Sequence, residues 1–228
     1  MNTSLKIFNC SFKNIDSLNR VASRLLRESD EKIDSWFEKI IVENTILSGT
    51  FYFSLNTTLS QINPDTNIIE KINTKIINSN YFSLDTENNN IEFYGNLRGY
   101  SKFITNVNNT IEIIDSVDSP EVNLHMYLVN LLSRQIELRL VKITLHEIEF
   151  EETLIGKYEA RVSENANPIE IVEKYGEKII AFTLIFFFTN EEIKISITRS
   201  GSYRIRCLEK NLNEIVDILK TTQNSSYA

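Results

Sequence analysis

The sequence of 228 residues predicts an α+β protein built from two related halves. Stretches with apolar residues at every second position are typical of strands with one buried face, and apolar residues every three to four positions are typical of amphipathic helices. Both patterns occur in each half of the chain, and motifs of the first half recur in the second. Hydrophobic residues make up 42% of the chain, which is enough to bury a sizeable core.

In the first half, helical and strand spacings follow one another closely. Asn63-Pro64 is predicted to begin a helix, because Ile69, Ile72 and Ile76 recur with helical spacing. The predicted elements are, in order, a strand at 5–12, helices at 15–26 and 33–41, a strand at 46–55, the helix after Asn63-Pro64, strands at 81–84, 91–94 and 100–105, and a short helix at 111–114.

In the second half, a helix near 120–134 is apolar almost all round. Such a helix is not stable facing water, so we expect it to be buried between the halves or in a dimer. The elements predicted after it are, in order, strands at 136–150 and 158–162, a helix that Asn167-Pro168 begins, strands at 181–189, 193–198 and 203–208, and a closing helix at 212–219.

An internal repeat relates the two halves. Asn63-Pro64 recurs as Asn167-Pro168, and the following IEKINTKII resembles VEKYGEKII, with Glu70 and Glu173 separated by 103 residues (173 − 70). We therefore expect residues 50–115 and 157–220 to superpose. The predicted organisation is an N-terminal extension (1–45), a first repeat (46–118), a connecting helix and strand (119–150), a second repeat (151–222) and a tail (223–228).

The segment from Thr198 to Lys220 contains a strand, a Ser-Gly turn, a second strand and a long amphipathic helix. This series resembles the repeat of the TATA-binding-protein family, although Leu208-Glu209 stand where that family usually carries a glycine. The resemblance implies two repeats that share one curved sheet, helices on one face, and DNA on the open face. A tandem ferredoxin-like arrangement fits the same order of elements.

Composition and motifs argue against several classes of function. The net charge of −7 argues against indiscriminate phosphate binding, although a local basic face that binds phosphates is compatible with this net charge. Cys10 and Cys207 form no ligand pair, His125 and His146 lack partners, and there is no phosphate loop or hydrolase motif. The longest apolar run is half of a membrane span. We expect a cytoplasmic protein without membrane, metal or cofactor, and not an enzyme.

Cationic residues on the polar side of the predicted strands are the candidate binding site. Phe182, Leu184 and Phe186 are expected to face the helices, which places Phe187 on the open face of the sheet. The candidate residues are Lys194, Arg199, Arg204 and Arg206, with Arg98 and Lys102 as their counterparts in the first repeat, together with Phe187 and Tyr94.

Three functions remain open from the sequence. The first is a non-enzymatic binding or regulatory protein that holds double-stranded DNA on its open sheet face, as the family resemblance implies. The second is a protein-interaction or assembly module that forms a homodimer. The third is a sensor of a small ligand on a duplicated scaffold. Because fold does not determine function, the resemblance does not choose among them.

Overall fold

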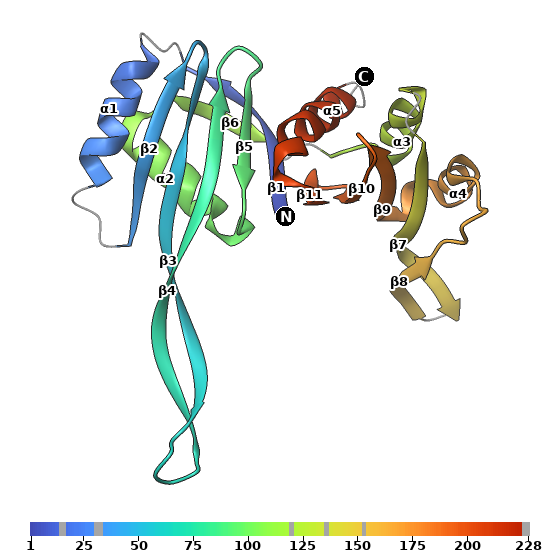
Figure 1. The fold of residues 1–228 in the computed structure, drawn as a ribbon, viewed down its shortest axis with the longest axis horizontal. Coiled ribbons are helices and arrows are strands. Elements are labelled where there is room, and N and C mark those ends of the chain that lie inside the picture. Colours follow the sequence, from blue (N-terminus) through green and yellow to red (C-terminus); the bar gives the residue numbers. More distant parts are fainter. Residues whose placement is uncertain (14–16, 30–33, 119–120, 135–136, 152–153, 225–228) are drawn as a thin grey trace. The chain divides into compact units, whose positions relative to one another are not determined.

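The computed structural model describes residues 1–13, 17–29, 34–118, 121–134, 137–151 and 154–224 (Figure 1). The chain forms two compact units. The N-terminal unit is Asn9–Val117, and the C-terminal unit combines Met1–Phe8 with Asp118–Ala228. Both are α+β, and every strand pairing with a defined register in the described residues is antiparallel. Among these residues no helix has the length and apolar character that crossing a membrane requires.

In the N-terminal unit the sheet order is β2-β3-β4-β5-β1, and β6 also pairs with β1. Its elements are β1 (Asn2–Phe12, shared with the other unit), α1 (Leu18–Ser29), β2 (Ser35–Glu43), β3 (Ile46–Ile62), β4 (Ile69–Asp85), β5 (Asn90–Tyr94), the 3-10 helix η1 (Leu97–Gly99), α2 (Tyr100–Ile111) and β6 (Ile114–Asp118). Figure 1 shows α2 behind the strands.

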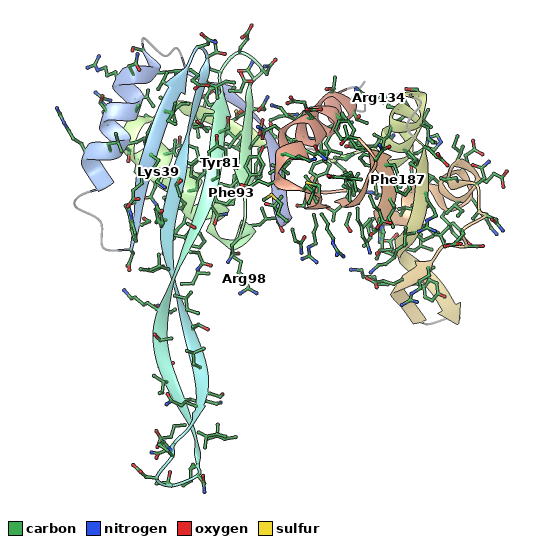
Figure 2. The ribbon with its side chains drawn as sticks, viewed as in Figure 1. Lys39, Tyr81, Phe93, Arg98, Arg134 and Phe187 are labelled. Atoms are coloured by element: carbon green, nitrogen blue, oxygen red, sulfur yellow. The ribbon has the colours of Figure 1, made fainter. Side chains whose placement is uncertain are left out.

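A cluster of aromatic rings forms the core of this unit. Phe103 on α2 packs against Phe82, Phe93 and Phe51, with ring centroids 4.8, 5.1 and 5.5 Å away. Phe93 lies on β5 (Figure 2). All four phenylalanines are fully buried. This packing fixes α2 against one face of the sheet, so the opposite face of these strands is the open one.

Several predicted elements of this unit are wrong. No helix lies at 111–114, because α2 ends at Ile111 and strand β6 begins at Ile114. The helix expected at 33–41 is strand β2 in its described part, and the strand expected at 100–105 is the start of α2. Trp36 and Phe37 are neighbours that point to opposite sides of the sheet: Phe37 is buried, whereas Trp36 stacks on Tyr52. Phe103, Val107 and Thr110 are all buried, and the step of three residues from Val107 to Thr110 keeps them on one face of a helix but not on one face of a strand.

The hairpin of β3 and β4 is far longer than predicted. The two strands pair without a register shift from Ile46↔Asp85 to Ile62↔Ile69. Asn63-Pro64 does not begin a helix, because the Asn63 side chain accepts a hydrogen bond from the Asp65 backbone N–H at 2.9 Å and so forms the turn of this hairpin. The far part projects as a two-stranded ribbon (Figure 1), which we call the β-arm (residues 54–77).

The C-terminal unit agrees closely with the predicted order of elements. Its sheet order is β1-β11-β10-β9-β7-β8. Its elements are α3 (Leu124–Ser133), β7 (Leu138–Glu151), β8 (Leu154–Arg161), α4 (Pro168–Tyr175), the 3-10 helix η2 (Gly176–Lys178), β9 (Ile179–Phe188), β10 (Glu191–Thr198), β11 (Ser202–Arg206), the 3-10 helix η3 (Glu209–Asn211) and α5 (Leu212–Asn224).

The apolar helix α3 is buried within its own unit. Leu124, Tyr127, Leu128 and Leu131 are almost inaccessible, and α3 contacts α4, α5 and β9. The Tyr127 hydroxyl donates a hydrogen bond to the backbone carbonyl of Leu219 on α5, at 3.3 Å. The helix is buried, as expected, but the expectation that the other half of the chain or a second copy covers it is wrong, because α4, α5 and β9 of its own unit do so.

The two units share an order of elements. Each has a helix, four strands that are consecutive in the sheet, a 3-10 turn and a second helix; β8 and α4 are inserted in the C-terminal unit. The elements β11, η3 and α5 each begin 112 residues after β5, η1 and α2 (202 − 90, 209 − 97 and 212 − 100). The predicted pairing of Asn63-Pro64 with Asn167-Pro168 is wrong, because the first lies in a hairpin turn and the second begins α4.

Candidate binding face

The helices of the C-terminal unit cover one face of its sheet, and alternate residues of each strand point to the other. On β9, Phe182, Leu184 and Phe186 are at most 1% exposed. Phe187, the next residue, is 63% exposed (Figure 2). Figure 1 shows α5 and α3 on one side of these strands. The odd-numbered residues of β9 therefore define the face that the helices leave open.

Cross-strand pairing places cationic residues next to one another on this open face. Lys194 on β10 lies opposite Arg206 on β11 and opposite Ile185 on β9. Ile185 lies opposite Arg139 on β7. Directly opposed residues of antiparallel strands project to the same side, with Cβ atoms about 4.5–5.5 Å apart. One row across the sheet thus contains Arg206, Lys194 and Arg139.

A second row of cations runs beside the first. Arg204 lies opposite Ser196, which lies opposite Thr183, and the Ser196 and Thr183 hydroxyls are hydrogen-bonded at 2.9 Å. Thr183 lies opposite Lys142, which lies opposite Arg161 on β8. With Lys6 of β1, which pairs with Ser202, these residues form what we call the cationic face: Lys6, Arg139, Lys142, Arg161, Lys194, Arg204 and Arg206.

Carboxylates neutralise only the outer part of the cationic face. Arg139 pairs with Glu164 at 2.5 Å and Lys142 with Glu159 at 2.7 Å. Within the part of the chain that the structure describes, Lys194, Arg204 and Arg206 form no ion pair. Burial lowers the pKa of Lys6, whose ammonium lies 4.8 Å from the centre of the Phe8 ring. The three cations at the centre of the face are therefore unpaired, although the exposed carboxylate of Glu192, opposite Phe187, shares their face.

Arg199, a predicted contact, does not join this face. Its guanidinium donates hydrogen bonds to the backbone carbonyls of Glu177 and Ile179, the latter at 2.9 Å, and lies 3.8 Å from the Glu121 carboxylate. These contacts tie the turn between β10 and β11 to η2. The guanidinium donors are therefore used within the protein.

The predicted counterparts in the first repeat belong to the N-terminal unit. Lys102 lies on a helix, and its ammonium donates to the backbone carbonyl of Ser54 at 3.0 Å. Arg98 lies in η1 (Figure 2). The Tyr94 hydroxyl donates to Glu92 at 2.5 Å, and its ring is 5.5 Å from that of Tyr81. These residues do not form a cationic row like that of the C-terminal unit.

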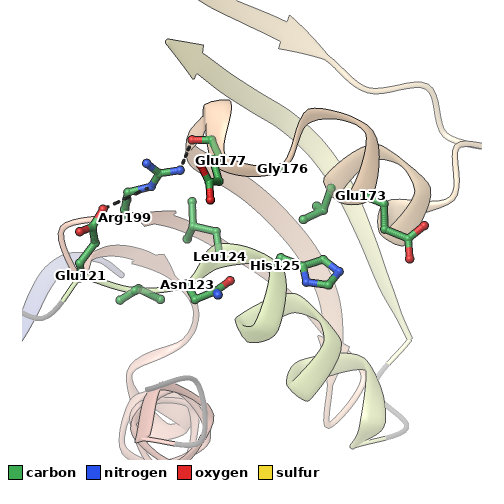
Figure 3. A pocket seen from close by; sticks show the side chains of 10 residues that line it. Glu121, Asn123, Leu124, His125, Glu173, Gly176, Glu177 and Arg199 are labelled. Carbon is green, nitrogen blue, oxygen red and sulfur yellow. Dashed lines mark hydrogen bonds and ion pairs between the residues drawn. The ribbon is translucent and has the colours of Figure 1, made fainter. Parts of the chain in front are cut away.

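A pocket of about 770 Å³ lies in the C-terminal unit. Figure 3 shows Arg199 between Glu121 and the backbone of Glu177, with His125 apart from them on α3. The pocket mixes one imidazole with carboxylates: its wall comprises Glu121, Val122, Asn123, Leu124, His125, Val172, Glu173, Gly176, Glu177 and Arg199. No serine, threonine or cysteine lines it, so it offers no side-chain hydroxyl or thiol for nucleophilic attack.

The two thiols are poor candidates for catalysis. Both cysteines are buried. Burial, with a smaller contribution from the Asp85 charge, raises the pKa of the Cys10 thiol to about 12, and burial also raises the pKa of Cys207. The nucleophile is the thiolate, and burial disfavours that form at both positions. The described residues contain no group of three His, Cys, Asp or Glu side chains that could hold a metal ion.

Sequence reasoning missed Lys6, Arg139, Lys142 and Arg161. The alternation of Leu138, Arg139 and Leu140 could have placed Arg139 on a polar strand face. It could not have shown which strands are neighbours.

Comparisons with known proteins identify no relative of this chain. No protein-family model matches it, and no curated protein matches its sequence.

Proposed function

We propose that this protein is a non-enzymatic nucleic-acid-binding protein and that the cationic face is its contact surface for double-stranded DNA. The observation that carries the proposal is the register that sets Lys194 opposite Arg206, with Arg204 one row away, on the face that no helix covers. These three side chains are exposed and form no ion pair within the described residues. Closely spaced Lys and Arg side chains are the groups that contact DNA phosphates.

The repeated order of elements supports the same proposal. We infer that the two units are repeats of one strand–helix–four strands–helix motif, with β1 and β6 as the leading strands. Burial agrees at the separation of 112 residues: Phe93 and Ile205 are buried, as are Phe103 and Ile215. A ferredoxin-like unit would place a helix between pairs of strands, whereas here four strands follow one another in the sheet. The TATA-binding-like organisation therefore fits better, and it leaves one sheet face open.

The net charge of the chain limits how the face can bind. A protein with a net charge of −7 is repelled by DNA as a whole, so the attraction must come from the local cluster. Contacts of this kind release counterions, which makes the affinity fall steeply as salt rises. We therefore expect binding at low ionic strength that weakens quickly toward physiological salt.

The proposal is tested by fluorescence anisotropy with a duplex oligonucleotide at several salt concentrations, starting near ~50 mM. The variant Arg204→Gln/Arg206→Gln should weaken binding and lower the slope of log K against log salt by about two units, because each lost phosphate contact removes about 0.9. The control Arg20→Gln/Arg24→Gln removes the same charge from exposed positions on α1.

The control variant should leave the slope unchanged. No detectable binding by the unmodified protein at the lowest salt would refute the proposal. Equal weakening by both double variants would also refute it, because the effect would then reflect net charge and not the cationic face.

A further inference from the structure

The strands of the N-terminal unit have an open sheet face of their own, and its chemistry differs from that of the cationic face. The helices α1 and α2 contact each other on the buried side of these strands. Figure 1 shows α2 behind the strands. Because Phe51 and Phe82 pack against Phe103 of α2, their strand neighbours Tyr52 and Tyr81 project to the open side.

Four aromatic side chains form a line across this open face. Trp36 on β2 lies opposite Tyr52 on β3, and their rings are stacked with centroids 5.0 Å apart. Tyr81 on β4 and Tyr94 on β5 form a second pair, with centroids 5.5 Å apart. Tyr52 lies opposite Ser79, so Tyr81 is its diagonal neighbour at about 7–8 Å. Tyr81 is 49% exposed (Figure 2) and the other three rings are half-buried, so the line of rings is accessible to a partner.

Carboxylates share this face with the aromatic rings. Glu38 is exposed, and its carboxylate accepts a hydrogen bond from the Trp36 indole N–H at 2.9 Å. Glu92 accepts a hydrogen bond from the Tyr94 hydroxyl at 2.5 Å, and Glu43 lies on the same side at the end of β2. We call the following residues the acidic-aromatic face: Trp36, Glu38, Glu43, Tyr52, Tyr81, Glu92 and Tyr94.

Cations are missing from the paired residues of this face. In the body of the unit, no residue that the register of β2 to β5 turns to this side is Lys or Arg. Lys39 lies outside the register, in the bulge of β2. Lys75 of the β-arm is bound to Asp34 at 2.8 Å. Glu38 forms no ion pair within the described residues, so its charge is available to a partner.

We propose that the acidic-aromatic face binds an extended, arginine-rich segment of another protein. A guanidinium stacks on aromatic rings and forms paired hydrogen bonds with a carboxylate, and this face offers both groups side by side. Alternate side chains of an extended segment are about 6.6–6.8 Å apart, close to the separation of Tyr52 from Tyr81. The inference is independent of the proposed DNA contact, because it uses none of the residues of the cationic face.

Other occupants suit the acidic-aromatic face less well. The bases of a nucleic acid can stack on the rings, but the carboxylates repel its phosphates and no cation in register attracts them. A neutral oligosaccharide can also lie on the rings, but it gains nothing from the negative charge. An apolar partner would bury the Glu38 carboxylate without a counter-ion, which costs free energy. Charge complementarity therefore selects a cationic partner.

Trp36 gives the test a local signal, because it is the only tryptophan in the chain. The full chain is titrated with a short synthetic peptide of alternating arginine and serine, and the emission of Trp36 should change until it saturates. Glu38→Gln/Tyr81→Ser removes one charge and one ring from the face and should weaken binding at least about tenfold. The control Glu173→Gln/Tyr158→Ser removes the same groups from the C-terminal unit, where Tyr158 is 47% exposed. It should change the affinity less than about twofold.

Circular dichroism of each variant establishes that the sheet is retained. Emission of Trp36 that does not respond to the peptide up to about 1 mM would overturn the inference. Equal weakening by both double variants would also overturn it, because the peptide would then follow the net charge of the chain. A response of Trp36 to a single-stranded oligonucleotide or to maltohexaose, and not to the peptide, would overturn it in favour of bases or sugars. Self-association that Glu38→Gln/Tyr81→Ser abolishes, measured by sedimentation equilibrium, would overturn it in favour of a second copy.

Discussion

At the scale of single residues, neighbouring side chains of a strand have opposite environments. Phe186 is 1% exposed and lies under the helices of the C-terminal unit, while Phe187 is 63% exposed on the open face. The same alternation separates the buried Ile195 from the exposed Lys194 on β10. The alternation of side chains along a strand therefore assigns Phe186 and Ile195 to the face that the helices cover, and Phe187 and Lys194 to the open face, which carries the cations.

The two phenylalanines predict a clear contrast in stability. Phe187→Ala should change the free energy of unfolding by less than about 1 kcal/mol, because the ring is already mostly in water. Phe186→Ala should cost about 3–5 kcal/mol through the cavity that it leaves. Urea denaturation of both variants measures the difference. A large loss for Phe187→Ala would show that the open face is covered in solution.

At the scale of secondary-structure elements, similar sequences adopt different structures. The segment IEKINTKII of the first half is strand β4, whereas VEKYGEKII runs from helix α4 through η2 into β9. Ile72 and Ile76 satisfy a helical spacing, but four residues apart they also share one face of a strand. Asn167 caps α4 by accepting a hydrogen bond from the Ile169 backbone N–H at 3.0 Å, and Pro168 takes the first helical position. Asn63 uses the same side-chain chemistry to make a turn.

The junction of η1 and α2 depends on a close approach to β3. A Cβ atom on Gly99 would lie 2.4 Å from the ring of Phe53, while the φ of Gly99, −78°, suits any residue. Gly99→Ala should therefore destabilise the protein by about 1–3 kcal/mol through overpacking. Urea denaturation measures this loss. The double variant Gly99→Ala/Phe53→Leu should lose less than the sum of the single variants, and strict additivity would contradict the steric explanation.

At the scale of the whole molecule, β1 belongs to both units. Its first residues pair with β11, from Asn2↔Arg206 to Lys6↔Ser202, and its last residues belong to the N-terminal unit. The N-terminal ammonium also donates to the backbone carbonyl of Cys207. The first residues of the chain thus complete a sheet whose other strands follow more than a hundred positions later.

Deleting residues 2–6 should loosen the C-terminal unit at β11. The backbone N–H groups of β11 that bond to β1 would lose their partners and exchange faster with solvent. Hydrogen exchange followed by mass spectrometry should show the change in residues 202–206, with little change in the segment around Phe51 and Phe82. Unaltered exchange in β11 would contradict the pairing of β1 with this strand.

The sequence by itself determined the α+β class and nearly every element of the C-terminal unit. It succeeded there because β10 and β11 alternate between apolar and polar residues, and because β9 is a continuous run of mostly apolar residues rich in isoleucine and phenylalanine. Asn167-Pro168 and the closing amphipathic helix also carry strong local signals. The sequence also placed Lys194, Arg204, Arg206 and Phe187 on the polar parity of their strands. These are properties of local periodicity, which does not depend on distant parts of the chain.

Only the tertiary structure decided the β-arm, the start of α2 and the membership of the cationic face. Isoleucine spacing at 69, 72 and 76 suits either period, and pairing with β3 selects the strand. The elements β11, η3 and α5 begin 112 residues after β5, η1 and α2, whereas the matched residues of the sequence are separated by 103. Lys6, Arg139 and Arg161 lie far apart in sequence and meet on one face because strand order and register, set by pairing across the whole sheet, bring them there.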